Sequence, residues 1–184
     1  MSKAKILLCR HYPQAVIDRA RRDYDVVLPE QDVSANGDAL VDQLHGVDGA
    51  LIAASNKFTA DVFAKMPERL KIIAGFGVGY EHVDLEAARD KGVVVTNSPD
   101  VLNDATADTA LLLLLAASRR ARESFEMVVK GEWVGWSPTM LLGKQPTGKR
   151  IGIIGMGRIG RAMADRCRAL GMEIQSRRRS GLGG

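Results

Sequence analysis

The chain has 184 residues, of which 46% are hydrophobic and 26% charged, and it carries a net charge of +4 at pH 7. This composition excludes disordered, collagen-like and coiled-coil proteins, and the length suits one ordinary domain or two small ones rather than a complete large two-domain enzyme. The longest apolar run, 110–117, is far shorter than the roughly 20 residues that span a bilayer. Because the first residues also lack the features of a secretory signal, we expect a cytoplasmic protein that does not contact membranes.

Up to about residue 97, short apolar runs alternate with helical patterns. The expected strands are 6–9, 26–28, 49–53, 70–74 and 93–95, and the expected helices are 13–22, 38–44, 59–66 and 85–91. Such alternation predicts a parallel sheet covered by helices on both faces. We therefore expect residues 1–100 to form a complete α/β domain of the flavodoxin-like class.

After Pro99 the pattern changes. A long helix is expected over 104–122, and its apolar middle, 111–117, predicts burial between two bodies. The stretch 131–147 is expected to be a connector whose two tryptophans pin it to a surface. A new β-α-β unit follows, with a strand at 150–154, a helix at 158–170 and a strand from 172 to about 176.

The two cysteines, Cys9 and Cys167, lie in apolar or helical patterns and are expected to be buried thiols. They are too few for a disulfide framework or a metal cluster, so no metal site is expected. The positive charge is concentrated late in the chain: from Lys149 onward there are nine Lys and Arg and two acidic residues, so this stretch carries +7 and the first 148 residues carry −3. Such asymmetry can mark a nucleic-acid arm or a site for an anionic ligand.

The strongest motif is Gly155-Met156-Gly157-Arg158-Ile159-Gly160, which lies between an expected strand and an expected helix. The first glycine permits a tight turn, the second lets the backbone approach a pyrophosphate, and the third lets the helix pack against the strand. Free N–H groups at the start of the helix would then bind the phosphates. A dinucleotide site is therefore favoured over a plain tight turn.

The residues about 20 positions past the first glycine distinguish NAD from NADP. NAD-binding folds usually have an acidic residue there, whereas this chain has Gln175-Ser176-Arg177-Arg178, and Glu173 lies at the other end of its strand. A hydroxyl and two guanidinium groups suit the 2′-phosphate of NADP(H). The alternative is a solvated terminal run of charge, with NAD(H) possible as the cofactor.

The segment 76–84 reads Phe-Gly-Val-Gly-Tyr-Glu-His-Val-Asp and follows an expected strand. Ligands of parallel α/β sheets bind outside the carboxyl ends of strands, and the glycines in this segment could expose N–H groups to a carboxylate. The alternative is a flexible loop. His82 is interpreted as a packing or helix-start residue rather than an acid–base group, and His11 and His45 have no partner pattern.

Together these blocks resemble the D-isomer-specific 2-hydroxyacid dehydrogenases, and within them the glyoxylate/hydroxypyruvate reductase branch. The resemblance runs in order through 76–80, 96–99, 104–109, 131–136 and 148–160. It implies a substrate domain over 1–100, followed over 101–184 by a hinge helix and the start of a Rossmann NAD(P)-binding domain. It also implies an oxidoreductase that reduces a small 2-oxo acid, such as glyoxylate or hydroxypyruvate, with NADP(H) preferred, and a homodimer at full length.

The same resemblance implies roles for individual residues. Backbone N–H groups of Val78 and Gly79 would hold the substrate carboxylate, and Thr109 would touch the cofactor. The pyrophosphate would lie against Gly155, Gly157, Arg158, Ile159 and Gly160, and the 2′-phosphate would contact Ser176, Arg177 and Arg178.

The family's catalytic histidine, glutamate and arginine lie in its second Rossmann half, and no Pro-His motif occurs in this chain. We therefore expect no catalytic residue here, and hypothesise a truncated chain that is inactive alone. Two other interpretations are a non-catalytic nucleotide-binding module that partners another chain and a nucleic-acid binder that uses the basic C-terminal third. The last is disfavoured, because most of those arginines lie in a dinucleotide motif and its helix without interleaved aromatic residues.

Overall fold

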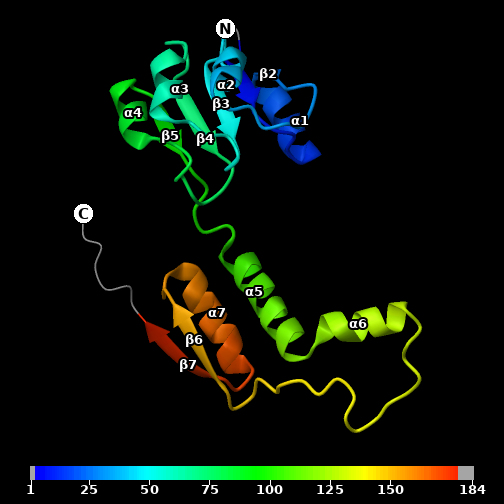
Figure 1. The fold of residues 1–184 in the computed structure, drawn as a ribbon. Helices are drawn as coiled ribbons and strands as arrows, with labels where there is room; N and C mark the ends of the chain where they lie inside the picture. Colours follow the sequence, from blue (N-terminus) through cyan, green and yellow to red (C-terminus); the bar gives the residue numbers. More distant parts are fainter. Residues whose placement is uncertain (1–2, 178–184) are drawn as a thin grey trace. The chain divides into compact units, whose positions relative to one another are not determined.

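The computed structural model describes residues 3–177 (Figure 1). The chain divides into two compact units, Met1–Pro99 (unit 1) and Asp100–Gly184 (unit 2). Each unit is built around its own parallel sheet. Among the described residues, no helix has the length and apolar content required to cross a bilayer.

Unit 1 contains a sheet of five parallel strands in the order β2-β1-β3-β4-β5. The strands are β1 (Lys5–Leu8), β2 (Asp25–Val27), β3 (Gly49–Ile52), β4 (Ile72–Gly75) and β5 (Val94–Thr96). The register places Ile6 of β1 opposite both Val26 and Gly49. This is the strand order of flavodoxin-like folds, so the predicted fold class is confirmed.

Four helices connect these strands: α1 (Gln14–Asp23), α2 (Asp38–Gln43), α3 (Ala60–Lys65) and α4 (Leu85–Asp90). Alternate residues of a strand point to opposite faces of the sheet. Leu7 and Ile73 therefore pack with α2, α3 and α4 in one buried core, which includes Phe58 and Phe63. Leu8 packs with α1 in a smaller core on the other face.

Polar side chains set the starts of two of these helices. The Thr59 side chain accepts a hydrogen bond from an N–H in the first turn of α3. The Asp84 carboxylate accepts one from the Ala87 N–H of α4 at 3.0 Å. Such caps satisfy N–H groups that a first helical turn leaves free. Asp84 thereby also fixes the end of the loop that follows β4.

Unit 2 is built from the helices α5, α6 and α7 and two parallel strands. Their bounds are α5 (Asn103–Ser118), α6 (Ala121–Val129), β6 (Arg150–Ile154), α7 (Arg158–Ala169) and β7 (Glu173–Arg177). α7 connects β6 to β7, which confirms the predicted β-α-β unit. α5 packs beside α7, where the Arg166 guanidinium donates hydrogen bonds to Asp104 at 3.0 Å and Asp108 at 2.5 Å.

The predicted helix over 104–122 is wrong at its C-terminal end. α5 ends at Ser118, because Arg120 adopts a left-handed φ of +54° through which a right-handed helix cannot continue. The Ser118 carbonyl instead accepts a hydrogen bond from the Lys144 N–H at 2.7 Å. Beyond this turn Arg120 pairs with Glu123 at 2.9 Å, and α6 follows, a helix that the sequence pattern did not indicate.

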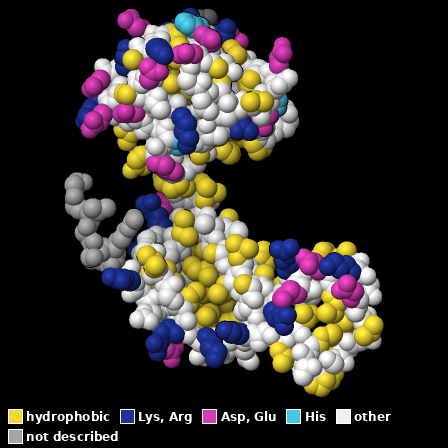
Figure 2. Space-filling view, viewed as in Figure 1, with side chains coloured by type: hydrophobic (Ala, Val, Ile, Leu, Met, Phe, Trp, Pro, Cys, Tyr) yellow, Lys and Arg dark blue, Asp and Glu magenta, His cyan; other side chains and the backbone are white. Residues whose placement is uncertain are grey.

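Unit 2 by itself does not bury the apolar middle of α5, so its predicted burial between two bodies stays a prediction. The helices of unit 2 that contact α5 are α7 and α6, and they leave Leu112 and Leu113 65% and 64% exposed. The tryptophans of the connector are not pinned either, because the segment between α6 and β6 has no helix or strand; Trp136 is 80% exposed. Figure 2 shows the resulting apolar side chains open on the visible face of unit 2.

Both cysteines are buried free thiols, as predicted. Burial raises the pKa of Cys9 to about 12 and also raises the pKa of Cys167. A thiol with a raised pKa is a poor nucleophile at neutral pH. Across residues 3–177, no three His, Cys, Asp or Glu side chains gather where a metal ion could bind.

Candidate functional site

The first group of predicted site residues lies in the loop that follows β4 in unit 1. The loop leaves the carboxyl edge of the sheet, where the Phe76 N–H donates to the Ile52 carbonyl at 2.8 Å. Gly77 adopts a φ of +156°, a conformation that L side chains rarely adopt. Val78 and Gly79 thus lie beyond the strand ends, at the edge where ligands of parallel α/β sheets bind.

Two hydrogen bonds from the end of β5 hold consecutive carbonyls of this loop. The Ser98 N–H donates to the Gly77 carbonyl and the Asn97 side-chain amide donates to the Val78 carbonyl, each at 2.8 Å. Within residues 3–177, the N–H groups of Val78 and Gly79 donate to no acceptor. Two adjacent free donors on a turn of the backbone are suited to binding an anionic oxygen pair.

His82 and Glu81 flank these donors in different ways. The His82 side chain is buried, neither ring nitrogen has a hydrogen-bond partner, and burial lowers its pKa. Its carbonyl accepts the Phe58 N–H at 2.9 Å, so His82 packs the loop against the core. The Glu81 carboxylate lies beside Gly79, where any side chain on that glycine would meet it. A negative charge there weakens the binding of an anion by the same loop.

No histidine in the described residues is arranged for proton transfer. His11 Nε2 lies 2.8 Å from the Pro29 carbonyl oxygen, and His45 is exposed. None of the three rings forms a hydrogen bond with a carboxylate anywhere in residues 3–177. Residues 3–177 therefore contain no histidine–carboxylate pair of the kind that transfers a proton.

The second group of predicted site residues forms the turn between β6 and α7 in unit 2. Gly155 adopts a φ of +95°, a left-handed value that favours glycine. Gly157 precedes α7 without a side-chain cap, so no side chain covers the first N–H groups of the helix. A Cβ on Gly160 would overlap the Gly155 carbonyl oxygen, which means that only glycine allows this close packing of helix and turn. Each of the three glycines thus fulfils the local requirement of a pyrophosphate turn.

The end of β7 lies beside this turn. The Gly155 N–H donates to the Arg177 carbonyl at 3.3 Å, and Ser176 and Arg177 lie opposite Ile153 and Ile154. Arg177 is therefore the last residue of the strand, one position beyond the predicted end. Consecutive strand residues point to opposite faces, so Ser176 and Arg177 would approach a phosphate from different sides. Arg178 lies outside the described residues.

The remaining predicted cofactor contacts are exposed. The Arg158 guanidinium pairs with the Asp100 carboxylate at 2.8 Å, and Ile159 is 40% exposed in the first turn of α7. The Thr109 hydroxyl donates to the Ala105 carbonyl one turn earlier in α5, at 2.9 Å. No described contact joins Thr109 to the glycine turn.

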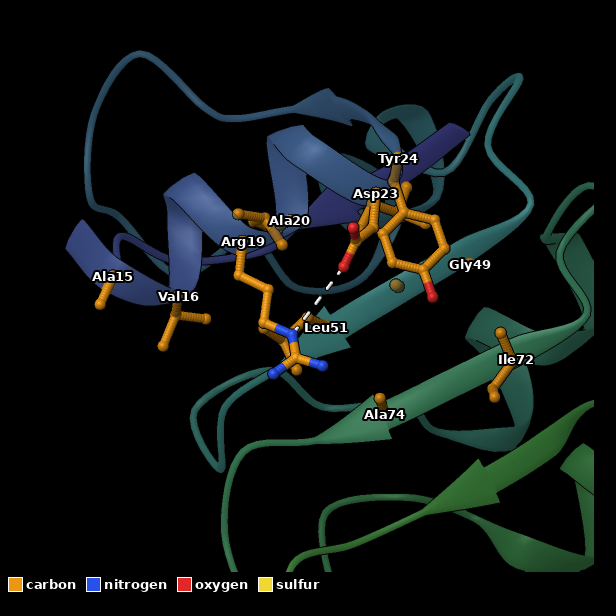
Figure 3. Close-up of a pocket in the computed structure, with 13 residues that line it drawn as sticks. Ala15, Val16, Arg19, Ala20, Asp23, Tyr24, Gly49, Leu51, Ile72 and Ala74 are labelled. Carbon is orange, nitrogen blue, oxygen red and sulfur yellow. Dashed lines mark ion pairs between the residues drawn. The ribbon is translucent and has the colours of Figure 1, made fainter. Parts of the chain in front are cut away.

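A hollow of about 480 Å³ lies elsewhere, between α1 and the sheet of unit 1 (Figure 3). Val16, Leu51, Ile72 and Ala74 line it, and its charged side chains, Arg19 and Asp23, lie 3.8 Å apart as an ion pair. It marks a part of the sheet that α1 leaves uncovered. None of the predicted site residues lines it.

Comparison with known proteins decides the family. The family described as "D-isomer specific 2-hydroxyacid dehydrogenase, catalytic domain" matches residues 6–177. The chain belongs to this family. Its sequence is 42% identical to that of a glyoxylate reductase of Thermococcus onnurineus, over 94% of this chain and 52% of that protein. It is 38% identical to a glycerate dehydrogenase of Hyphomicrobium methylovorum over 95% of this chain and 54% of that protein.

Solved structures agree. A Polaromonas protein assigned as a D-isomer-specific, NAD-binding 2-hydroxyacid dehydrogenase superposes with a TM-score of 0.91 at 41% identity, over 100% of this chain and 57% of that one. A glyoxylate reductase of a Paecilomyces species superposes with a TM-score of 0.78 at 28% identity, over 100% of this chain and 58% of that one. The chain spans about half the length of the curated relatives it matches.

Sequence reasoning assigned no role to Asn97 and Ser98, although the block 96–99 contributed to the resemblance. Their position in the sequence could have indicated this role, because they directly follow β5. The pairing of β5 with β4 ends at Ala74 and Thr96, so Asn97 and Ser98 lie next to the loop that leaves β4. Polar residues directly after a neighbouring strand are the groups that can reach that loop.

Proposed function

We propose that this chain supplies the carboxylate site and the pyrophosphate site of an oxidoreductase that reduces a small 2-oxo acid, glyoxylate or hydroxypyruvate, to the 2-hydroxy acid. The nicotinamide cofactor would supply the hydride when bound. The part played by the described residues is to bind and orient the two ligands. The family supports the reaction class, since its members are 2-hydroxyacid dehydrogenases.

The observation that carries this proposal is the pair of free N–H groups at Val78 and Gly79. A carboxylate presents two oxygens that two adjacent donors can satisfy, and hydrogen bonds to a charged acceptor are stronger than neutral ones. The named substrates of two relatives, glyoxylate and glycerate, are small carboxylates. The loop is therefore suited to the one group that these molecules share.

For the cofactor we propose NADP(H) in preference to NAD(H). The glycine turn fits a pyrophosphate, since the backbone requires glycine at 155 and 160, and Gly157 leaves open space at the start of α7. Ser176 and Arg177 lie beside the turn without an acidic residue at the end of β7, and Glu173 pairs with Arg150 at the opposite end of the strand. A guanidinium without an adjacent carboxylate suits a 2′-phosphate and does not replace the carboxylate that binds a ribose hydroxyl in NAD sites.

Titration of the purified chain with NADPH and with NADH tests the cofactor site. We expect NADPH to bind at least about tenfold more tightly, and Arg177→Ala to remove most of this difference. Arg150→Ala, which removes a strand-start arginine paired with Glu173, should leave it unchanged. Equal affinities for the two nucleotides would contradict the NADP(H) preference.

We propose further that the chain by itself binds these ligands without turnover, because its histidines lack a carboxylate partner in residues 3–177. Oxidation of NADPH with glyoxylate or hydroxypyruvate, followed at 340 nm, tests this. Clear turnover would overturn it, whereas binding without turnover also fits the alternative of a nucleotide-binding module that acts on another chain. Activity of a version extended to the length of the relatives would then favour the enzyme over the module.

A nucleic-acid function is not favoured, because several basic residues of unit 2 form ion pairs. Arg158 pairs with Asp100, Arg166 with Asp104 and Asp108, and Arg168 with Asp165. A measured affinity for DNA or RNA that falls steeply with salt would revive it.

The proposal also includes a cytoplasmic location, consistent with two unpaired thiols, and a homodimer for the full-length protein. Light scattering of the full-length protein tests the dimer: a mass equal to one chain would contradict it.

A further inference from the structure

In the loop at 76–84, called here the carboxylate loop, none of the loop's own side chains forms a hydrogen bond with the peptide groups of Val78 and Gly79. Glycine stands at 75, 77 and 79, and glycine has the largest freedom of backbone rotation. The pairing of β4 with β5 also stops at Ala74 and Thr96, before the loop begins. Whatever holds the donors in place must therefore reach the loop from outside it.

The two hydrogen bonds from the end of β5 act on the peptide groups that carry the donors. A peptide group is planar and trans, so its N–H points opposite to its carbonyl. The Gly77 carbonyl shares a peptide group with the Val78 N–H, and the Val78 carbonyl shares one with the Gly79 N–H. Because the Ser98 N–H holds the first carbonyl and the Asn97 amide holds the second, each donor is fixed from behind.

We infer that Asn97 is a positioning residue for the substrate carboxylate: its side-chain amide, 2.8 Å from the Val78 carbonyl oxygen, orients the Gly79 N–H. This inference rests on the proposed function of the loop. A hydrogen bond to a carbonyl also polarises the N–H of the same peptide group and makes it a stronger donor. The Val78 N–H depends on a backbone bond instead, which no side-chain substitution removes.

The closing experiment follows backbone amide signals of the full chain by ¹H–¹⁵N NMR during titration with glycolate, a 2-hydroxy acid, and with glycolamide, its neutral amide. In the unsubstituted chain we expect glycolate, and not glycolamide, to shift the Val78 and Gly79 amides. The variants are Asn97→Ala and Asn97→Ser, which remove the amide donor without adding charge.

Both variants should weaken glycolate binding by about tenfold, which is the usual effect of losing one hydrogen bond to a charged group, here that of the Gly79 N–H to the carboxylate. They should also reduce the glycolate-induced shift of Gly79 more than that of Val78, since the Ser98 bond remains. A purely structural role of Asn97 would not produce this difference between neighbouring amides.

The matched control is Asn36→Ala. The Asn36 side chain accepts the Lys57 N–H at 2.6 Å, so it also joins two distant segments of unit 1 by an exposed side-chain bond, but it does not bond the Val78 or Gly79 peptide groups. The Asn36→Ala variant should therefore bind glycolate with unchanged affinity. Comparable affinity and an unchanged Gly79 shift in both Asn97 variants would overturn the inference alone. Absence of any glycolate shift at Val78 and Gly79 in the unsubstituted chain would instead overturn the proposed carboxylate site, and with it this inference.

Discussion

The two units of this chain place similar backbone chemistry on very different supports. In unit 1 the carboxylate loop leaves a five-stranded sheet with a continuous buried core. In unit 2 the glycine turn leaves a two-stranded sheet, and the buried hydrophobic residues number only Ala107, Ala164, Cys167 and Met172 among those described. Unit 2 therefore buries far less apolar surface around its turn than unit 1 buries around its loop. Local geometry of a site can therefore be complete where the packing around it is not.

The largest predicted difference between the two units is the loss of folding stability when a phenylalanine is replaced by alanine. Phe58 is fully buried in unit 1, with its ring centroid 5.9 Å from that of Phe63, whereas Phe125 of α6 is 71% exposed. Phe58→Ala should lower the free energy of unfolding of unit 1 by about 3–5 kcal/mol. Phe125→Ala should change stability by less than about 0.5 kcal/mol. Chemical denaturation followed by circular dichroism compares them, and a loss for Phe125→Ala as large as that for Phe58→Ala would show that α6 is covered in solution.

The second prediction tests the turn of unit 2. Gly160→Ala forces a methyl group against the Gly155 carbonyl oxygen and should weaken NADPH binding by more than about tenfold. Gly152→Ala in β6 is the matched control, because a Cβ there meets open space. Nucleotide titrations measure both variants. Equal affinities for the two would mean that the turn does not bind the pyrophosphate.

Unit 1 should lose stability in mild acid, because it contains the buried side chain of His82. Burial lowers the pKa of His82 in the folded state, so below the ordinary value of 6.5 the unfolded chain binds more protons than the folded one. Stability of unit 1 should therefore fall as the pH drops from about 7 through 6.5 and below. His82→Gln should flatten this dependence, measured as the urea midpoint at several pH values. An unchanged pH profile in the variant would show that His82 titrates as freely in the fold as out of it.

The carboxylates of Asp32 and Asp48 act at lower pH. Arg10 and the His11 N–H lower the pKa of Asp32 to about 2, and Arg69 and the Lys5 N–H do the same for Asp48. Their contributions are present above the ordinary pKa of 3.8 and are lost as the pH falls towards 2. They are thus separable from the His82 effect by pH alone.

The smallest predicted effect concerns the charge beside the carboxylate loop. Glu81→Gln removes a negative charge next to Gly79 and should strengthen glycolate binding by about two- to threefold at low salt. The gain should shrink in 1 M NaCl. Glu86→Gln, an exposed acidic residue of the following helix, serves as the control. Weaker binding in Glu81→Gln would mean that the glutamate supports the ligand rather than repelling it.

Sequence reasoning predicted the elements of both units well, because periodicity and caps are local properties. The alternation of apolar runs sufficed for the five parallel strands, and the three glycines at 155, 157 and 160 sufficed for the turn before α7. The turn at Arg120 escaped prediction, because a left-handed arginine has no local signature. The exposure of Trp136 also escaped it, because burial depends on partners that a single segment does not contain.

The same distinction applies to the candidate sites. Glycine spacing pointed to Val78 and Gly79, but the hydrogen bonds that orient their peptide groups join residues about twenty positions apart and depend on the strand order. The roles of Asn97 and Ser98 became visible only when β5 was placed beside β4.

The most direct test of the account is an amide NMR titration of the unsubstituted chain with NADPH and glycolate, each added alone. NADPH should shift the amides of Gly157, Arg158, Ile159 and Gly160 in unit 2, and glycolate should shift those of Val78 and Gly79 in unit 1. Shifts confined to other residues, such as those lining the hollow beside α1, would contradict it.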